Sequence, residues 1–317
     1  MADGQDDLHA LAYAAMDRGA LQEASRHFDA LLARTPGHGA YHYMRGLVHK
    51  YLLDWPTSLD HNLRAIELAD EAGEAEQWNA AIAATALGDW ARVRALWQAR
   101  GIRVPDGQGP IVDDYGLAVV RLNPWAGGET VWARRIDPVR ARLLNAPLPE
   151  SGHRFGDIVL HDGAPTGWRW NGERKVSVFN ELQRLEPSPF VTHAAFVRCD
   201  RSEDLQTLLD ATVPGLGYVE DWTHSIQHYC LRCSYGVPHR HDAGVVNDDW
   251  SANRALGIAA QSRRSVEKVL KDWQAGGTGR DVEGIEVREV LAPAHVEGHV
   301  WWREPESEAD GVKAEPS

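Results

Sequence analysis

The sequence predicts a mixed α+β protein built from several units, with helical repeats first, a β-rich segment next and an α/β unit last. Apolar residues at helical spacing recur with a period of about 34 residues over residues 5–107. Short β-branched and aromatic runs, broken by Gly and Pro, follow over residues 115–186. From Phe190 strand-like and helix-like patterns alternate. We therefore expect units at 1–108, 109–186 and 187–303, and an acidic tail at 304–317 that is too poor in apolar residues to fold.

The first hundred residues divide into three similar windows, which start near Gln5, Gly39 and Glu74. Each window contains two amphipathic helices, because small, bulky and turn-compatible residues recur at fixed places. Small residues stand at the eighth place (Ala12, Gly46, Ala81), and small or modest ones at the twentieth (Ala24, Ser58, Val93). Bulky residues stand at the seventeenth place (Leu21, Trp55, Trp90), and a turn-compatible residue closes each window (Pro36, Asp70, Pro105). Small residues let helices approach closely, while large ones fill the groove between units. The expected helices are 7–18, 21–34, 39–52, 57–71, 75–86 and 89–100.

This pattern resembles the tetratricopeptide (TPR) repeat over about a third of the chain. The first window matches best, while the second departs from the family pattern, with Asn62 where a large ring is expected and Pro56 just after Trp55. The resemblance implies a groove that binds a protein or peptide, lined by the first helix of each unit. Candidate partner contacts on the first helix of the second unit are Tyr41, His42, Tyr43, Arg45 and His49, with Tyr41, His42, Arg45 and His49 as the favoured four. Alternatively, the tyrosines of this helix pack between units.

The segment 115–186 is expected to form a small sheet or barrel. Its predicted strands are 117–122, 130–136, 155–160, 168–170 and 175–179, with hairpin turns at Asp162-Gly163 and Asn171-Gly172. The tryptophans of this segment are expected to cover a small core, although the Trp168-Arg-Trp170 pair is also the kind of feature that marks a contact surface.

The last unit is expected to order its elements as βαββαβ, the ferredoxin-like arrangement. The expected strands are 190–198, 217–222, 225–231 and 285–291, and the expected helices are 202–211 and 252–273. Cys199 lies on the first of these strands and is expected to be a small core residue.

The strongest local sign of chemistry is a Cys/His cluster in twelve residues. Its four candidate metal ligands are Cys230, Cys233, His239 and His241. Two Cys three residues apart and two His two apart can converge on one ion, and four N/S ligands satisfy tetrahedral zinc. Four protein ligands would close the site, so we expect structural zinc that stabilises the loop. His228 and Asp242 are reserve ligands, and the alternative is a reduced Cys pair with two surface histidines.

An enzyme is the less favoured interpretation. His239-Arg-His241-Asp242 partly resembles the metal motif of metallo-β-lactamase-fold hydrolases, but Asp242 directly follows the second His and no Asp-His pair comes next. Asp248 and Asp249 would have to supply further carboxylates to a hydrolytic centre. The chain has no Gly-x-Ser-x-Gly elbow, phosphate-binding loop or dinucleotide fingerprint.

Charge and composition favour a protein partner. The formal net charge is −13 and no Lys/Arg cluster supplies a nucleic-acid footprint, whereas an acidic surface steers basic proteins. No apolar run is long enough to span a bilayer and the N-terminus lacks a signal peptide's features, so we expect a cytoplasmic protein. We expect a non-enzymatic protein-binding protein, best matched to a bacterial immunity (neutralising) or adaptor role toward a basic partner. The alternatives are a co-chaperone or scaffold, or a metal-dependent hydrolase.

Overall fold

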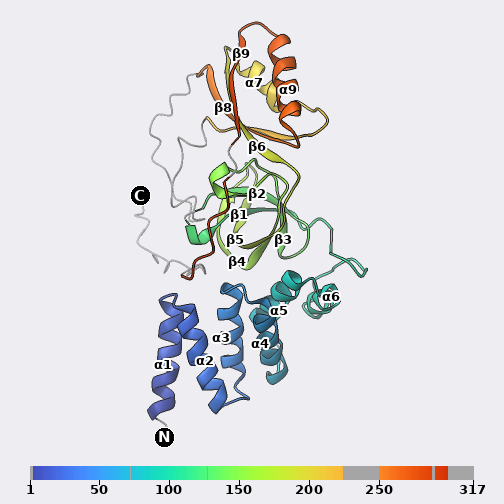
Figure 1. Ribbon diagram of the computed structural model, residues 1–317. Coiled ribbons are helices and arrows are strands. Elements are labelled where there is room, and N and C mark those ends of the chain that lie inside the picture. Colours follow the sequence, from blue (N-terminus) through green and yellow to red (C-terminus); the bar gives the residue numbers. More distant parts are fainter. Residues whose placement is uncertain (1–2, 72, 127, 224–249, 288–289, 299–317) are drawn as a thin grey trace, which may run out of the picture.

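The computed structural model describes residues 3–71, 73–126, 128–223, 250–287 and 290–298. Helices come first and a strand-rich region follows, so the expected mixed α+β fold is confirmed. Figure 1 shows three bodies in a row: a helical array, a closed barrel above it, and a sheet with two helices at the far end. No helix in the described part of the chain has the length and apolar character needed to cross a membrane.

The helical array consists of six helices that pack as consecutive neighbours. They are α1 (Asp3–Asp17), α2 (Leu21–Arg34), α3 (Gly39–Tyr51), α4 (Trp55–Leu68), α5 (Glu74–Leu87) and α6 (Trp90–Ala99). Local chemistry sets their ends. Asp54 and Asp89 cap the N-termini of α4 and α6 by accepting hydrogen bonds from the backbone N–H three residues on. Gly88 ends α5 in the left-handed conformation, with φ of 70°.

The second repeat window is packed around Asn62 instead of a large ring. A Cβ atom on Gly46 would collide with the Asn62 amide, so α3 and α4 approach closely here. The buried Asn62 amide donates to the Ser58 carbonyl at 2.8 Å, and the Ser58 hydroxyl donates to the Gly46 carbonyl at 2.8 Å. Two hydrogen-bonded polar side chains thus occupy the place of the ring that the repeat pattern predicts.

The barrel has five strands, and it closes by parallel pairing of the first strand with the last. The strands are β1 (Leu117–Arg121), β2 (Thr130–Arg135), β3 (Arg140–Leu143), β4 (Ile158–Trp170) and β5 (Lys175–Glu186), with short 3₁₀ turns η1 (Pro124–Ala126) and η2 (Pro149–Ser151) between them. The predicted turn at Asn171-Gly172 joins β4 to β5. The predicted turn at Asp162-Gly163 is wrong, because both residues lie inside β4 where its pairing with β5 is irregular.

The tryptophan pair of the β4–β5 hairpin does not cover a core. Trp168 is 38% exposed and Trp170 is 59% exposed. They share a face of the hairpin with Lys175 and Ser177, their cross-strand partners, while Val176 and Val178 are buried. The core interpretation is therefore wrong for this pair, and the contact-surface alternative stays open.

The third body is a four-stranded antiparallel sheet in the order β7-β8-β6-β9. Its elements follow the chain as β6 (Val191–Cys199), α7 (Ser202–Leu209), β7 (Leu216–Asp221), β8 (Asn253–Ala260), α9 (Arg263–Ala275) and β9 (Arg280–Val287). Apolar residues of both helices, including Trp273 and Leu208, pack with one face of the sheet, and Cys199 belongs to this core as expected. The predicted helix 252–273 is wrong in its first part, because residues 253–260 form the central strand β8.

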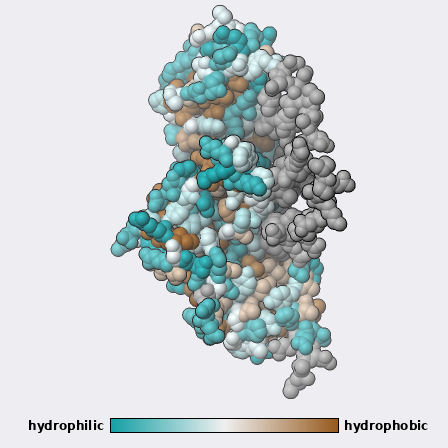
Figure 2. Space-filling model, turned by 180° about the vertical axis from the view of Figure 1, so that it is seen from behind, coloured by the Kyte–Doolittle hydropathy of each residue, from teal (hydrophilic) through white to brown (hydrophobic). Residues whose placement is uncertain are grey.

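Adjacent bodies share buried contacts. The core of the helical array continues into the barrel through Val139, Leu160 and Leu182. The barrel meets the sheet through a small cluster that includes Ala146, Trp222 and Ala259. On the face seen in Figure 2, hydrophilic residues cover most of the surface and apolar ones gather in the upper part, at the sheet.

Candidate functional site

A hollow on the described surface lies between the helical array and the barrel. It has a volume of about 490 Å³ and is open to solvent on one side. We call it the array pocket. Its lining comes from helices α1, α3 and α5 and from three consecutive residues of β4. These residues are Met16, Tyr43, Leu47, Lys50, Tyr51, Glu74, Ala75, Trp78, Asn79, Ile82, Asp162, Gly163 and Ala164. A mostly apolar hollow with a few convergent polar groups is the usual form of a binding site.

The helical spacing explains which residues line the array pocket. In α3 the lining residues are separated by four, three and one positions, which places them on one face of the helix. Tyr43 and Leu47 of α3 correspond, one repeat later, to Trp78 and Ile82 of α5. The repeat therefore delivers an aromatic and an aliphatic side chain from each of these two first helices to the same surface.

A buried polar network forms the end of the pocket next to the barrel. Lys50 Nζ donates to Asp162 Oδ1 at 2.9 Å and to Asn79 Oδ1 at 3.0 Å, and the Tyr51 hydroxyl donates to Asp162 Oδ2 at 2.8 Å. The backbone N–H of Gly163 also donates to Asp162, at 2.7 Å. Three donors thus satisfy one carboxylate, and the array and the barrel are joined by a charged pair.

The network fixes the ionisation of its members. Burial alone would raise the pKa of Asp162, but the Lys50 charge and the hydrogen bonds outweigh it, so the pKa is lowered and the carboxylate stays ionised. The pKa of Tyr51 is raised well above its usual value by burial and by the charge of Asp162, so the phenol stays protonated and donates. A neutral tyrosine and an ion pair are a positioning device, and neither group is poised for proton transfer near neutral pH.

Gly163 lets the barrel approach the array closely. A Cβ atom at this position would lie 2.7 Å from Cε3 of Trp78, well inside van der Waals contact. Trp78 also packs edge-on against Trp97 of α6, with ring centroids 4.8 Å apart. The indole is therefore held between a strand of the barrel and the last helix of the array, which fixes the wall of the pocket that it forms.

The aromatic part of the pocket lies in a negative local field. Burial raises the pKa of Tyr43, and the charges of Glu76 and Asp162 raise it further. Glu74 lines the pocket as well, and its exposed carboxylate is 3.2 Å from Arg100. The Lys50 ammonium lies 4.5 Å from the centroid of the Tyr51 ring, so one cation already contacts an aromatic face here.

Of the five candidate partner contacts on α3, Tyr43 lines the array pocket, and the favoured four lie on other faces of the helix. Tyr41 is 5% exposed and stacks on His38, with centroids 3.8 Å apart. His42 Nδ1 lies 2.8 Å from His61 Nδ1, so α3 and α4 meet there. The structure thus places these two side chains in contacts within the array.

The other two predicted contacts pair with neighbouring polar groups. Arg45 forms an ion pair with Asp29 of α2. His49 hydrogen-bonds Ser25 at 2.9 Å and Asp54 at 2.9 Å. The α3 residues that line the pocket together with Tyr43 are Leu47, Lys50 and Tyr51.

The four predicted zinc ligands, Cys230, Cys233, His239 and His241, lie outside the described residues. Within the described ranges, no three His, Cys, Asp or Glu side chains are grouped in a way that could hold a metal ion. His161, which precedes Asp162 in β4, is fully buried, and its Nδ1 hydrogen-bonds the Asp162 carbonyl at 2.7 Å.

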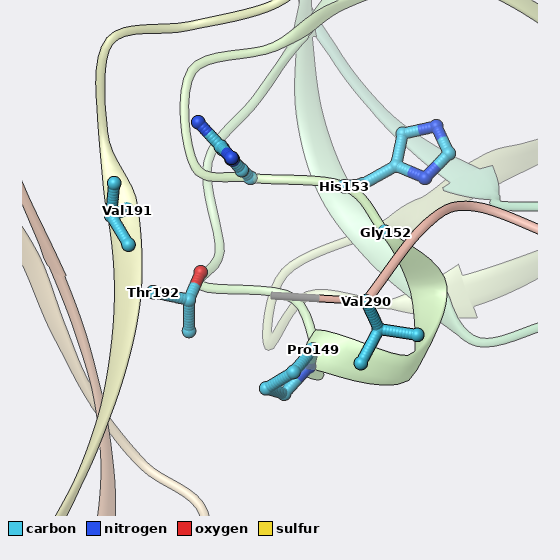
Figure 3. A pocket seen from close by; sticks show the side chains of 7 residues that line it. Pro149, Gly152, His153, Val191, Thr192 and Val290 are labelled. Carbon is cyan, nitrogen blue, oxygen red and sulfur yellow. The ribbon is translucent and has the colours of Figure 1, made fainter. Parts of the chain in front are cut away.

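A second hollow, between η2 and β6, is too small for a ligand. Its volume is about 20 Å³, enough for about one water molecule, and His153 at its edge points away from it (Figure 3). The His153 ring bonds the Ser151 carbonyl at 3.0 Å and Glu181 Oε1 at 2.6 Å. Burial lowers the pKa of His153, but the bond to Glu181 outweighs this and the pKa is raised. With both ring nitrogens on acceptors, His153 forms a buried ion pair with Glu181 that joins the chain after η2 to β5.

Sequence reasoning missed the barrel's contribution to the array pocket. Asp162 is 112 residues from Lys50 along the chain, and no local pattern relates them. A signal for the α3 and α5 residues was present in the repeat itself, because residues 43 and 78, and 47 and 82, occupy equivalent places. Comparisons with models of protein families, with curated proteins and with solved structures find no match to this chain.

Proposed function

We propose that this chain is a non-enzymatic protein-binding protein and that the array pocket holds a segment of its partner. The observation that carries the proposal is the pocket itself: a hollow of about 490 Å³ whose walls come from first helices and whose barrel end is fixed by the Lys50–Asp162 pair. Aromatic and aliphatic walls suit an apolar anchor side chain of a partner. We propose a TPR-like nature for the array on the same grounds, supported by helix pairs with the predicted spacing.

The proposed partner is a basic protein. The net charge of −13, the carboxylate of Glu74 at the pocket, the charge of Glu76 that acts on Tyr43 and the aromatic faces of the pocket all favour cationic groups next to the anchor. Among roles of this kind we favour a bacterial immunity or adaptor function in the cytoplasm, with a co-chaperone or scaffold as the alternative. Nucleic acid and membrane are not among the proposed partners.

The test is affinity capture with a blocked pocket. Ala75 is exposed and lines the pocket at the start of α5, so Ala75→Arg obstructs it with a good helix former and no core damage. Ala30→Arg is the matched control, because Ala30 is exposed on α2 and does not line the pocket. We expect the wild type and Ala30→Arg to capture one stoichiometric protein from a lysate of the source cells, and Ala75→Arg to lose it. Equal capture by all three would overturn the proposal.

For the third body we propose the ferredoxin-like arrangement. The chain order β6-α7-β7-β8-α9-β9 and the sheet order β7-β8-β6-β9, with antiparallel neighbours, support it. We also propose, on sequence alone, that Cys230, Cys233, His239 and His241 bind structural zinc.

Metal analysis tests the zinc site and the hydrolase alternative together. Protein purified without chelators should hold about one zinc per chain, and Cys233→Ser should release it and lower the melting temperature. Metal-free protein would refute the site. Esterase or phosphodiesterase turnover that His241→Ala abolishes would instead favour a metal-dependent hydrolase.

A further inference from the structure

Residues 290–298 form a strap that runs from the sheet, past the barrel, to the helical array (Figure 1). At the barrel the strap passes so close to η2 that a Cβ atom on Gly152 would collide with the Ala292 backbone. Next, the indole Nε1 of Trp125 donates to the Pro293 carbonyl at 3.3 Å, and the same ring packs edge-on against His295, with centroids 4.9 Å apart. One extended segment therefore contacts two separate turns of the barrel.

The lower half of the strap binds the array by two polar contacts. The His295 ring hydrogen-bonds the backbone carbonyl of Tyr51 at the end of α3. Glu297 Oε1 accepts a hydrogen bond of 2.7 Å from the backbone N–H of Gln22. Gln22 lies in the first turn of α2, whose N-cap residue, Ala20, makes no side-chain cap. A carboxylate from 275 residues away thus takes the place of the missing cap, where the helix dipole favours negative charge.

The strap is held by polar and ring contacts and hardly at all by apolar burial. Leu291 is 92% exposed and Val296 is 57% exposed, so the larger aliphatic side chains at these two places point to solvent. A segment with few buried apolar contacts opens locally much more readily than a core element. The surface beneath it is rigid by comparison, because it consists of a helix N-terminus, the end of another helix and an indole.

We propose that this surface, formed by the first turn of α2, the Tyr51 carbonyl and the Trp125 ring, is a peptide-binding strip that the chain's own residues 292–297 occupy. A partner segment of the same chemistry, an extended run with a carboxylate that reaches the α2 N-terminus, exchanges with the strap. The strip is distinct from the array pocket in what it binds. The two are adjacent through Tyr51, which offers its carbonyl to the strap and its hydroxyl to Asp162.

The first test measures amide hydrogen exchange in the full-length protein. Glu297→Ala should speed exchange at Gln22 at least tenfold, because no side-chain oxygen is left to accept its N–H. Glu283→Ala, an exposed change on β9, is the matched control and should leave Gln22 unaffected. Equal exchange at Gln22 in Glu297→Ala and the control would show that the carboxylate does not cap α2, and would overturn the proposal.

The second test adds the strap back as a separate molecule. A synthetic peptide of residues 290–298 is titrated into the His295→Ala/Glu297→Ala variant, whose strap is weakened but whose strip is intact. The peptide should restore slow exchange at Gln22, and the same peptide with Glu297→Ala should bind at least fivefold more weakly. No binding by either peptide, or equal binding by both, would refute the strip. Ala75→Arg should leave peptide binding unchanged, which separates this result from the fate of the pocket proposal.

Discussion

At the residue scale, the account depends most on the charged pair between Lys50 and Asp162. Both side chains are almost completely removed from water, and each is satisfied by further polar partners. A buried pair of this kind adds little net stability over apolar groups of the same shape, but removal of one partner leaves a bare buried charge. Its role here is to fix the register between the array and the barrel.

Asp162→Asn should therefore destabilise the protein strongly. It leaves the Lys50 ammonium beside a neutral amide, at an expected cost of roughly 3–5 kcal/mol in the free energy of unfolding by denaturant titration. Lys268→Gln is the control, because it breaks an exposed pair with Asp272 that is worth less than about 1 kcal/mol. A cost for Asp162→Asn as small as the control's would show that the array and the barrel are not joined through this carboxylate.

A second residue prediction concerns acid stability. Burial is the main cause that lowers the pKa of His161 to about 4, and its Nε2 has no hydrogen-bond partner within the described residues. The native state keeps His161 neutral below pH 6.5, where the unfolded chain takes up a proton. This residue's contribution to stability is therefore complete above about pH 6.5 and is lost as the pH falls toward 4.

His161→Gln should flatten that dependence. Glutamine can still donate to the Asp162 carbonyl but does not titrate, so the loss of unfolding free energy between pH 6.5 and 4 should be smaller in the variant. Denaturant titrations of both proteins at several pH values measure the difference. Parallel curves for the two proteins would mean that His161 titrates normally in the folded state.

At the scale of elements, the contact between β4 and α5 sets the shape of the pocket wall. Gly163→Ala should cost about 1–3 kcal/mol, because the new methyl group overlaps the Trp78 ring and neither the strand nor the indole can move freely. Gly37→Ala is the matched control, since a Cβ there meets nothing within 4 Å and its φ is not positive. The melting temperatures of the two variants give the comparison. An undisturbed Gly163→Ala protein would mean that β4 and α5 pack more loosely than the structure shows.

In the β4–β5 hairpin, by contrast, we expect a substitution of a large side chain to leave stability almost unchanged. Trp170→Thr should change the unfolding free energy by no more than about 0.5 kcal/mol, because the ring is 59% exposed. Trp97→Ala, by contrast, empties a fully buried site and should cost about 3–5 kcal/mol. If the two substitutions were equally damaging, Trp170 would belong to a core after all.

Helices and strands were predicted well from the sequence where apolar residues followed a single helical or strand spacing. They were predicted poorly where the apolar pattern of one element ran into that of the next. The α2 helix starts and ends at the predicted residues because Leu21, Ala24, Phe28, Leu31 and Leu32 form one apolar face. The apolar run of β8 joins directly to the pattern of α9, so the two together imitate one long helix. β3 has only four residues, Arg-Ala-Arg-Leu, too few for alternation to be recognised.

At the scale of the whole molecule, the pocket depends on the docking of two bodies. The repeat period placed the inner-face residues of α3 and α5 in equivalent positions, so these two walls of the pocket were present in the sequence pattern. The remaining wall next to the barrel comes from β4, where Asp162-Gly163 imitates a hairpin turn but lies inside a strand with irregular pairing. Tertiary contacts of this kind leave no local signature, because each residue is selected by a neighbour far away in the chain.

The bodies are also linked by the strap, which crosses from the sheet to the array. If the strap stabilises the array, Glu297→Ala should lower the midpoint of thermal unfolding modestly, by the equivalent of about 0.5–2 kcal/mol for a lost helix cap. Calorimetry of the full chain, with Glu283→Ala as the control, measures this. A midpoint identical to the control's would show that the cap contributes nothing to the folded state.

The most direct test of the central claim is site-specific photo-crosslinking inside source cells. A photoreactive phenylalanine analogue at Ala75 lies in the array pocket, and the same analogue at Ala30 lies outside it. The account predicts one dominant crosslinked protein from position 75, with the crosslink mapped to a basic segment that contains an apolar anchor, and none of it from position 30. Crosslinks to the same protein from position 30 but not from position 75 would contradict it.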